Sequence, residues 1–224
     1  MGQGRWIETP RWIGGRCEKE RAMIHESQPW REALKKDAQV LNRWASRTRA
    51  SERRAFIIER KIFLTAYAIR KLIESEKLSS STENEGIHCI AFRALPGAKQ
   101  LMERQKFEES YDFENKTHET LTLIKLTHLI IHSSILVECV DERMRMSGFL
   151  VTTKQKISSL FQIPLNEYMR AIELVADDDP STSQWAFDPE TQETLKWRGH
   201  GVPPRKILDK FSAIREKYST PGDE

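Results

Sequence analysis

The hydrophobic positions in the first third of the chain repeat with the period of an amphipathic helix. Ser27 followed by Pro29 is a typical helix start and predicts a first helix from this point. Its apolar side is marked by Trp30, Leu34, Leu41 and Trp44. A second, longer helix is predicted over 51–77. Its apolar residues are spaced for one face: Phe56, Ile57, Phe63, Leu64, Tyr67, Ile69 and Leu72.

The most informative stretch is 121–140, LTLIKLTHLIIHSSILVECV. Residues 126–137 contain no charged side chain, although 31% of the chain is charged. Such a segment has to be buried, and we expect it to belong to a helix over 116–145 that forms the spine of the core. His128 and His132 are four residues apart within it, so both imidazoles should project from one helix face.

The patterns elsewhere are shorter, and those that indicate strands lie mainly in the C-terminal half. In chain order, they predict an extended segment at 87–92, a short helix at 99–107, a hairpin at 148–163, a helix at 165–176 capped by Asn166, a second hairpin at 184–198 and a last helix after Pro203 and Pro204. The fold class is therefore expected to be mainly α: a helical bundle with one or two small β-hairpins in the C-terminal half.

The expected organisation is one domain with an N-terminal arm. Residues 1–26 form the arm, and 27–224 form a single mainly helical domain, with the bundle core over about 51–145 and β-hairpin and helix additions over 148–218. The arm contains Trp6 and Trp12. Because tryptophan is unfavourable in water, we expect the arm to pack on its own domain or on a second subunit.

Composition excludes several classes of protein. Three widely spaced cysteines without a C-x-x-C pair argue against a disulfide framework and against a cysteine-rich zinc site. No apolar run approaches the length of about 18 residues that a membrane span requires. We therefore expect a cytoplasmic protein that does not contact a membrane and needs no cofactor.

The net charge of +3 conceals a strongly basic segment. Residues 43–72 hold nine Lys and Arg residues against Glu52 and Glu59. Arginine binds phosphates and tryptophan stacks on bases, so this segment is a candidate face for RNA or DNA; the alternative is an ordinary solvated helix face. The residues concerned are Trp44, Arg47, Arg49, Arg53, Arg54, Arg60 and Lys61.

The two histidines of the central segment permit three interpretations. As metal ligands they would need further partners, and Leu129 stands where the zincin pattern has its glutamate, so we predict no metal. As core residues they would be hydrogen-bonded to neighbouring helices. The third interpretation is catalytic.

The catalytic interpretation comes from a resemblance. A long helix ending in AIRKLIESEKLS, with LTHLIIHSSILV in a later helix, resembles the HEPN superfamily of small helical bundles. The family motif has an Arg, often followed by Asn, and then a His near a dimer seam. The His falls on His132, Thr127 occupies the Arg position, and His128 stands where Asn is frequent. The resemblance covers 50–145, and the order of motifs is also similar to that of uncharacterised bacterial proteins.

The resemblance implies a homodimer and a site around His132. Family members with the intact motif cleave RNA without a metal: the His acts on the 2′-hydroxyl and the Arg steadies the phosphate. In this chain the missing Arg would have to be replaced by Lys125, two turns before His132, or by Arg198. Arg198 and His200 are also followed by Gly199 and Gly201 before the last helix, where they would form either an anion pocket or an ordinary turn.

Three function classes follow. The first is a bacterial-type nucleic-acid- or protein-binding regulatory module with a degraded HEPN-like site. The second is a metal-independent ribonuclease that uses His132. The third is a metal-dependent or small-molecule enzyme around His128, His132 and His200.

Overall fold

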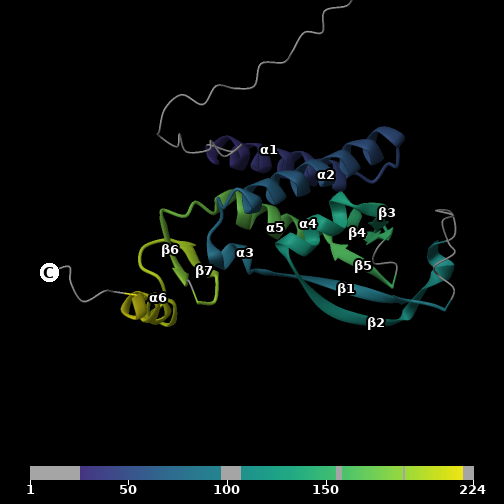
Figure 1. Ribbon diagram of the computed structural model, residues 1–224. Coiled ribbons are helices and arrows are strands. Elements are labelled where there is room, and N and C mark those ends of the chain that lie inside the picture. Colours follow the sequence, from purple (N-terminus) through teal and green to yellow (C-terminus); the bar gives the residue numbers. More distant parts are fainter. Residues whose placement is uncertain (1–25, 97–106, 155–157, 189, 219–224) are drawn as a thin grey trace, which may run out of the picture.

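The computed structural model describes residues 26–96, 107–154, 158–188 and 190–218 (Figure 1). The helices are α1 (Gln28–Ala45), α2 (Glu52–Glu74), α3 (Ser80–Glu83), α4 (Leu123–Ile131), α5 (Leu165–Asp177) and α6 (Arg205–Tyr218), with a 3-10 turn η2 (Phe107–Ser110). The strands are β1 (Gly86–Ala94), β2 (Tyr111–Thr122), β3 (Ser133–Val140), β4 (Met146–Thr153), β5 (Ser159–Pro164), β6 (Thr182–Asp188) and β7 (Glu193–Gly199). The structure is mixed α/β, so the predicted mainly α helical bundle is wrong.

Five strands form one antiparallel sheet in the order β2-β1-β5-β4-β3. Strands β6 and β7 form a separate hairpin. Figure 1 shows four helices stacked over one side of the larger sheet, with α4 and α5 next to it and α1 and α2 further out, whereas α6 lies beside the β6–β7 hairpin. The core between these layers is closed by side chains that are at most 1% exposed, including Leu41, Ile69, Leu126, Phe149 and Ile172.

The central segment accounts for most of the fold-class error. Instead of one helix over 116–145, it contains the end of β2, the nine-residue α4 and then β3. The helix ends at Ile131, and the β-branched residues that follow extend into β3, which pairs with β4 from Ser133 to Val140. β-branched side chains pack well on a pleated sheet, and the pairing of β3 with the following strand β4 overrides the helical pattern.

Most of the shorter predictions agree with the structure. Helices α1, α5 and α6 and the two hairpins lie where they were predicted. Asn166 is not a cap, because the N-cap of α5 is Pro164. The predicted short helix at 99–107 falls largely outside the described residues, as does the arm apart from its last residue.

Helix α2 has the predicted position, and the predicted core residues Ile69 and Leu72 are buried, but the rest of its buried face differs from the prediction. The side chains turned to the core are Arg54, Ile58, Ile62, Thr65, Ala66, Ala68, Ile69 and Leu72. Phe56, Leu64 and Tyr67 are exposed instead, by 63%, 41% and 46%. None of the helices in the described ranges is long and apolar enough to cross a membrane.

Candidate nucleic-acid interface

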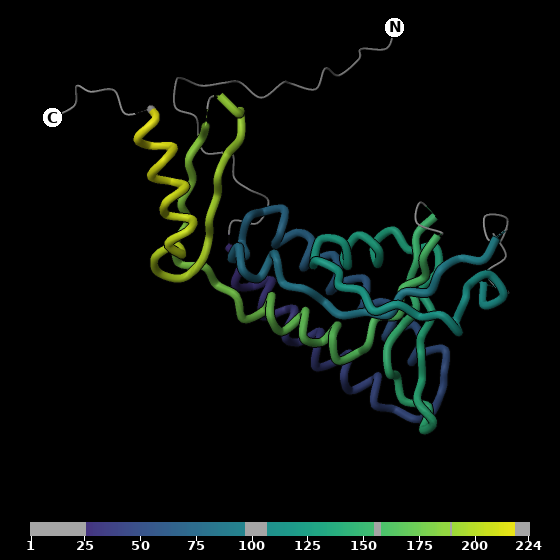
Figure 2. The backbone as a smooth tube through the Cα atoms, turned by 90° about the horizontal axis from the view of Figure 1, so that it is seen from below, coloured from purple at the N-terminus to yellow at the C-terminus, as the bar shows by residue number. Residues whose placement is uncertain are grey.

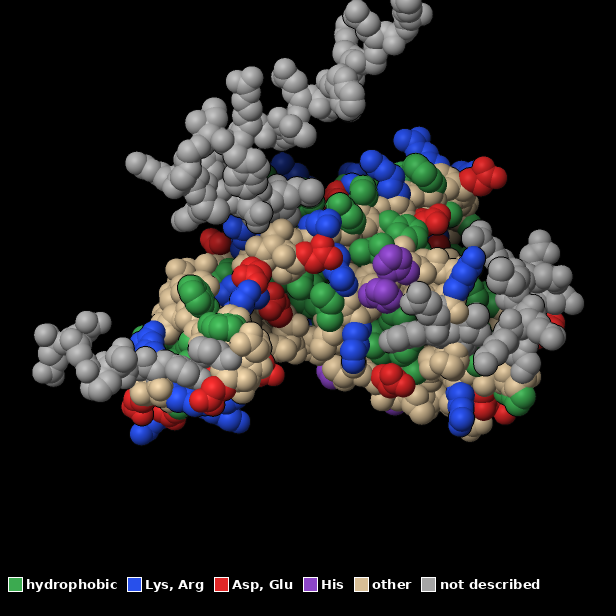
Figure 3. Space-filling view, in the orientation of Figure 1, with side chains coloured by type: hydrophobic (Ala, Val, Ile, Leu, Met, Phe, Trp, Pro, Cys, Tyr) green, Lys and Arg blue, Asp and Glu red, His purple; other side chains and the backbone are tan. Residues whose placement is uncertain are grey.

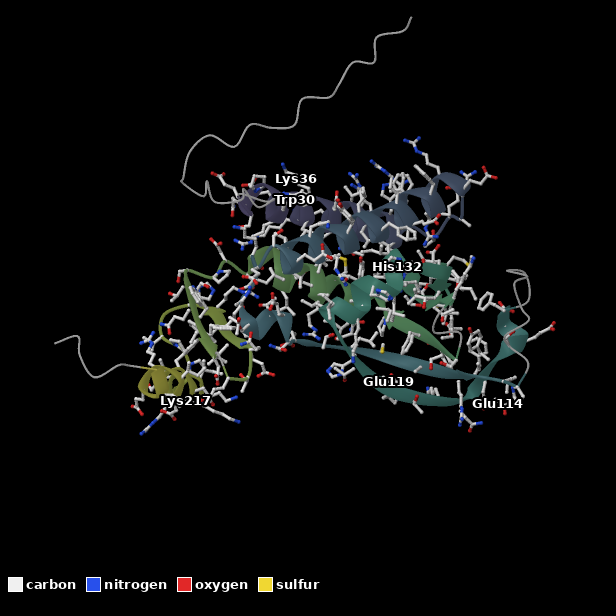
Figure 4. All side chains as sticks on the ribbon, viewed as in Figure 1. Trp30, Lys36, Glu114, Glu119, His132 and Lys217 are labelled. Carbon is white, nitrogen blue, oxygen red and sulfur yellow. The ribbon has the colours of Figure 1, made fainter. Side chains whose placement is uncertain are left out.

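The two histidines lie together at the end of α4. His128 is half-buried, and His132, which caps the helix, is exposed. Their ring centroids are 4.6 Å apart. Figure 3 shows two histidine side chains side by side on the surface, at the place where Figure 4 labels His132. The pair can accept and donate protons, and the exposed Lys125 lies on the same helix.

Thr127, which the HEPN resemblance aligns with an arginine, offers no charge to the His132 site. It is fully buried, and its hydroxyl donates to the carbonyl of Leu123 at 2.9 Å. Within the described ranges, no group of three or more His, Cys, Asp or Glu side chains is arranged to hold a metal. Lys125, two turns before His132, is the lysine that α4 itself contributes.

Arg198, proposed as the substitute cation, has a structural role instead. Its guanidinium donates to the carbonyl of Leu78 at 2.9 Å and to Glu83 at 2.5 Å, and it lies 3.3 Å from Glu76. These bonds tie β7 to the α2–α3 turn, whereas α4 packs against α2 and the sheet (Figure 1). The structure therefore does not bring Arg198 to the histidine pair.

His200 is also separate from the histidine pair. It is 65% exposed, and its Nε2 lies 3.9 Å from Oδ1 of Asp178. The other carboxylate oxygen of Asp178 accepts from the backbone N–H of Ser79 at 2.6 Å. Arg198 and His200 thus each lie beside carboxylates, and the contacts of Arg198 join the hairpin to the rest of the chain.

The two cysteines in the described part of the chain, Cys89 and Cys139, are poor nucleophiles. Burial raises the pKa of Cys89 to about 11, and burial also raises the pKa of Cys139. Both thiols are therefore protonated at neutral pH.

Two of the predicted nucleic-acid-binding cations are part of the fold. Arg54 is 4% exposed and forms a bidentate pair with Glu138 of β3, at 2.9 and 2.5 Å. Its Nε also donates to the carbonyl of Trp44 at 3.2 Å. Lys61 pairs with Asp37 of α1 in a half-buried position. Neither cation is available to a ligand.

The other arginines of this segment are exposed around the turn between α1 and α2. They are Arg43, Arg47, Arg49, Arg53 and Arg60, and none of them forms an ion pair with any described residue. Figure 3 shows Lys and Arg side chains gathered on the surface at the end of α1 and α2 where this turn lies. The only acidic side chains of the same segment are Glu52 and Glu59. We call this group of five arginines the basic tip.

Aromatic groups accompany the basic tip. The guanidinium carbon of Arg47 lies 3.7 Å from the centroid of the half-buried Trp44 ring. Phe56 lies between Arg53 and Arg60 at positions i, i+3 and i+7, so the three side chains share one face of α2. The sequence prediction missed Arg43 and placed Phe56 in the core. A second apolar stripe on the same helix could have shown that Phe56 lies outside the core, because it fits the helical period better. It consists of Ile58, Ile62, Ala66 and Ile69.

In comparisons with known proteins, no family model, curated protein or solved structure matched this chain.

Proposed function

We propose that this chain binds RNA or DNA through the basic tip, mainly by contacts with the phosphate backbone. The observation that carries the proposal is the contrast between two sets of cations. Arg54 and Lys61, which point into the structure, each have a carboxylate partner, whereas the five arginines of the basic tip have none among the described residues. Unneutralised arginines this close together repel one another and attract a polyanion.

Helix α2 adds to the positive potential. Its N-terminus carries the positive end of the helix dipole, and Arg53 lies in the first turn, where a cation is unfavourable. A bound phosphate would remove this conflict, because it would interact favourably with the helix end and with the guanidinium at once.

The aromatic residues supply a surface for bases. Phe56 is 63% exposed, and the Arg47–Trp44 stack presents a flat guanidinium to solvent. Stacking on such groups is independent of base identity. The proposed activity is therefore binding without strong sequence preference. It does not include cleavage, because Thr127 stands where the ribonuclease interpretation requires an arginine.

The proposal is tested by measuring the affinity of the full chain for a fluorescently labelled RNA and for the matching DNA duplex over a range of salt concentrations. Five phosphate contacts would give a slope of log K against log salt of up to about −4.5 for a duplex and about −3.5 for a single strand. Removing two contacts with Arg53→Ala and Arg60→Ala should make the duplex slope shallower by about 1.8 units.

A matched control removes two exposed cations from a distant helix. Lys206 and Lys210 on α6 are exposed and form no ion pair in the described part of the chain. The double change Lys206→Ala and Lys210→Ala alters net charge equally and should leave the slope unchanged. Equal effects of the two double variants, or an affinity that does not respond to salt, would contradict the proposal.

A further inference from the structure

A groove separates α1 from α5. Figure 2 shows these helices side by side, and the space between them is about 410 Å³, within the size range of ligand pockets. Its floor is made by Ala38, Met169, Ile172 and Ala176, and its rim by Lys35, Gln39, Asn42, Glu173 and Asp177. The floor is apolar and the rim is polar, which suits a flat apolar group with a polar edge.

The two carboxylates of the rim, Asp177 and Glu173, differ in their ion pairing. Lys35 and Asp177 pair with each other at 2.6 Å. Glu173 is exposed and has no ion-pair partner among the residues that the structure describes. A ligand that combines an aromatic ring with an adjacent cation therefore matches both the floor and the rim.

The chain itself contains such a group, in the residues that precede α1 in the sequence. Residues 5–7 and 11–13 are both Arg-Trp-Ile, and they belong to the 25 residues that precede the described part. Helix α1 begins at Gln28, so the groove begins about 10 Å along the helix, at Lys35. Trp12 is 16 residues before Gln28, and a chain of that length can span about 50 Å.

We propose that the indole of Trp12 occupies this groove and that Arg11 pairs with Glu173. The segment that binds belongs to the same chain as the groove, because its attachment to α1 gives it a high effective concentration there. The second tripeptide, around Trp6, has a longer tether and is disfavoured for that reason. Gly14 and Gly15 follow the docked tripeptide and permit the chain to reverse direction toward α1.

The test is oxidative footprinting of the full chain, read out by mass spectrometry. Trp185 is 69% exposed and serves as the internal reference. A docked state favoured tenfold would make Trp12 oxidise about tenfold more slowly than it does when released. Glu173→Lys should remove this protection, whereas Glu32→Lys, an equal charge reversal at an exposed site of α1 outside the groove, should preserve it.

A second measurement does not depend on oxidation chemistry. The methyl group of Met169, on the groove floor, should show a ring-current shift in the NMR spectrum that Trp12→Ala removes and Trp6→Ala leaves in place. The proposal is overturned if Trp12 is oxidised as fast as Trp185, if Glu173→Lys leaves its protection intact, or if protection is lost on dilution, which would assign the groove to a second copy of the chain.

Discussion

The neighbouring residues Arg53 and Arg54 allow folding and ligand binding to be separated by a pair of matched substitutions. Arg53 is exposed and belongs to the basic tip, whereas Arg54 is 4% exposed and connects α2 to β3 through Glu138. We expect Arg54→Met to destabilise the fold, and Arg53→Met to weaken nucleic-acid binding without destabilising it.

The magnitude for Arg54→Met follows from its contacts. The change removes both hydrogen bonds to Glu138 and the bond to the carbonyl of Trp44, and it leaves a carboxylate that is only 22% exposed without its cation. Breaking a buried pair from one side costs 3–5 kcal/mol, and the partial exposure of Glu138 places this pair at the lower end, about 3 kcal/mol. For a chain of this size the melting temperature should fall by about 6–12 °C.

The assay is urea unfolding followed by circular dichroism, with RNA affinity measured on the same samples. Arg53→Met should change the free energy of unfolding by less than about 0.5 kcal/mol and reduce the salt dependence of binding by about one phosphate contact. The double variant Arg54→Met with Glu138→Leu should recover most of the lost stability, because no charge is then left unpaired.

Two results would refute this reasoning. If Arg54→Met unfolds at the same urea concentration as the wild type, the pair with Glu138 does not hold α2 on β3. If Arg53→Met loses as much stability as Arg54→Met, the burial difference between them does not govern their roles.

Three further predictions concern other parts of the structure. Tyr168→Phe should cost about 1.5 kcal/mol in urea unfolding, because the fully buried hydroxyl lies 2.8 Å from that of Thr65 and donates to a backbone carbonyl; an unchanged midpoint would contradict this. The Arg170 guanidinium holds the pKa of Glu167 below its ordinary value. The wild type should therefore be more stable than Glu167→Gln at neutral pH, and this difference in the free energy of unfolding should vanish as the pH falls below about 4. A difference that does not change with pH would disprove the linkage. RNA incubated with the wild type should remain intact on a denaturing gel; cleavage that His132→Ala abolishes would show that the chain is a nuclease.

The elements that could be predicted from the sequence are those determined by local signals. Helix α1 has a proline in its first turn, and α5 and α6 show clear helical periodicity. The β6–β7 hairpin turns after Asp188, whose carboxylate accepts from the backbone N–H of Glu190 at 2.9 Å. These features depend on residues a few positions apart, which a sequence pattern records directly.

The sheet could not be predicted in the same way, because its pairings join distant segments. Strand β1 pairs with β5 through Ile90 and Gln162, which are 72 positions apart. Strand β2 carries the pattern NKTHET, whose side chains are exposed on both faces, so it lacks the alternation of a half-buried strand. It is held by the backbone ladder to β1, from Gly86 opposite Thr122 to Ala94 opposite Tyr111.

The candidate site shows the same division between local and distant causes. The i, i+4 spacing of His128 and His132 correctly placed both rings on one side of α4, because that spacing holds however short the helix is. The basic segment, in contrast, contains arginines of two kinds that composition cannot separate. Arg54 is buried at the start of α2, where its carboxylate partner Glu138 comes from β3, 84 positions later in the chain. A charged run therefore reveals a binding surface only after the cations that pair with carboxylates from distant strands have been identified and set aside.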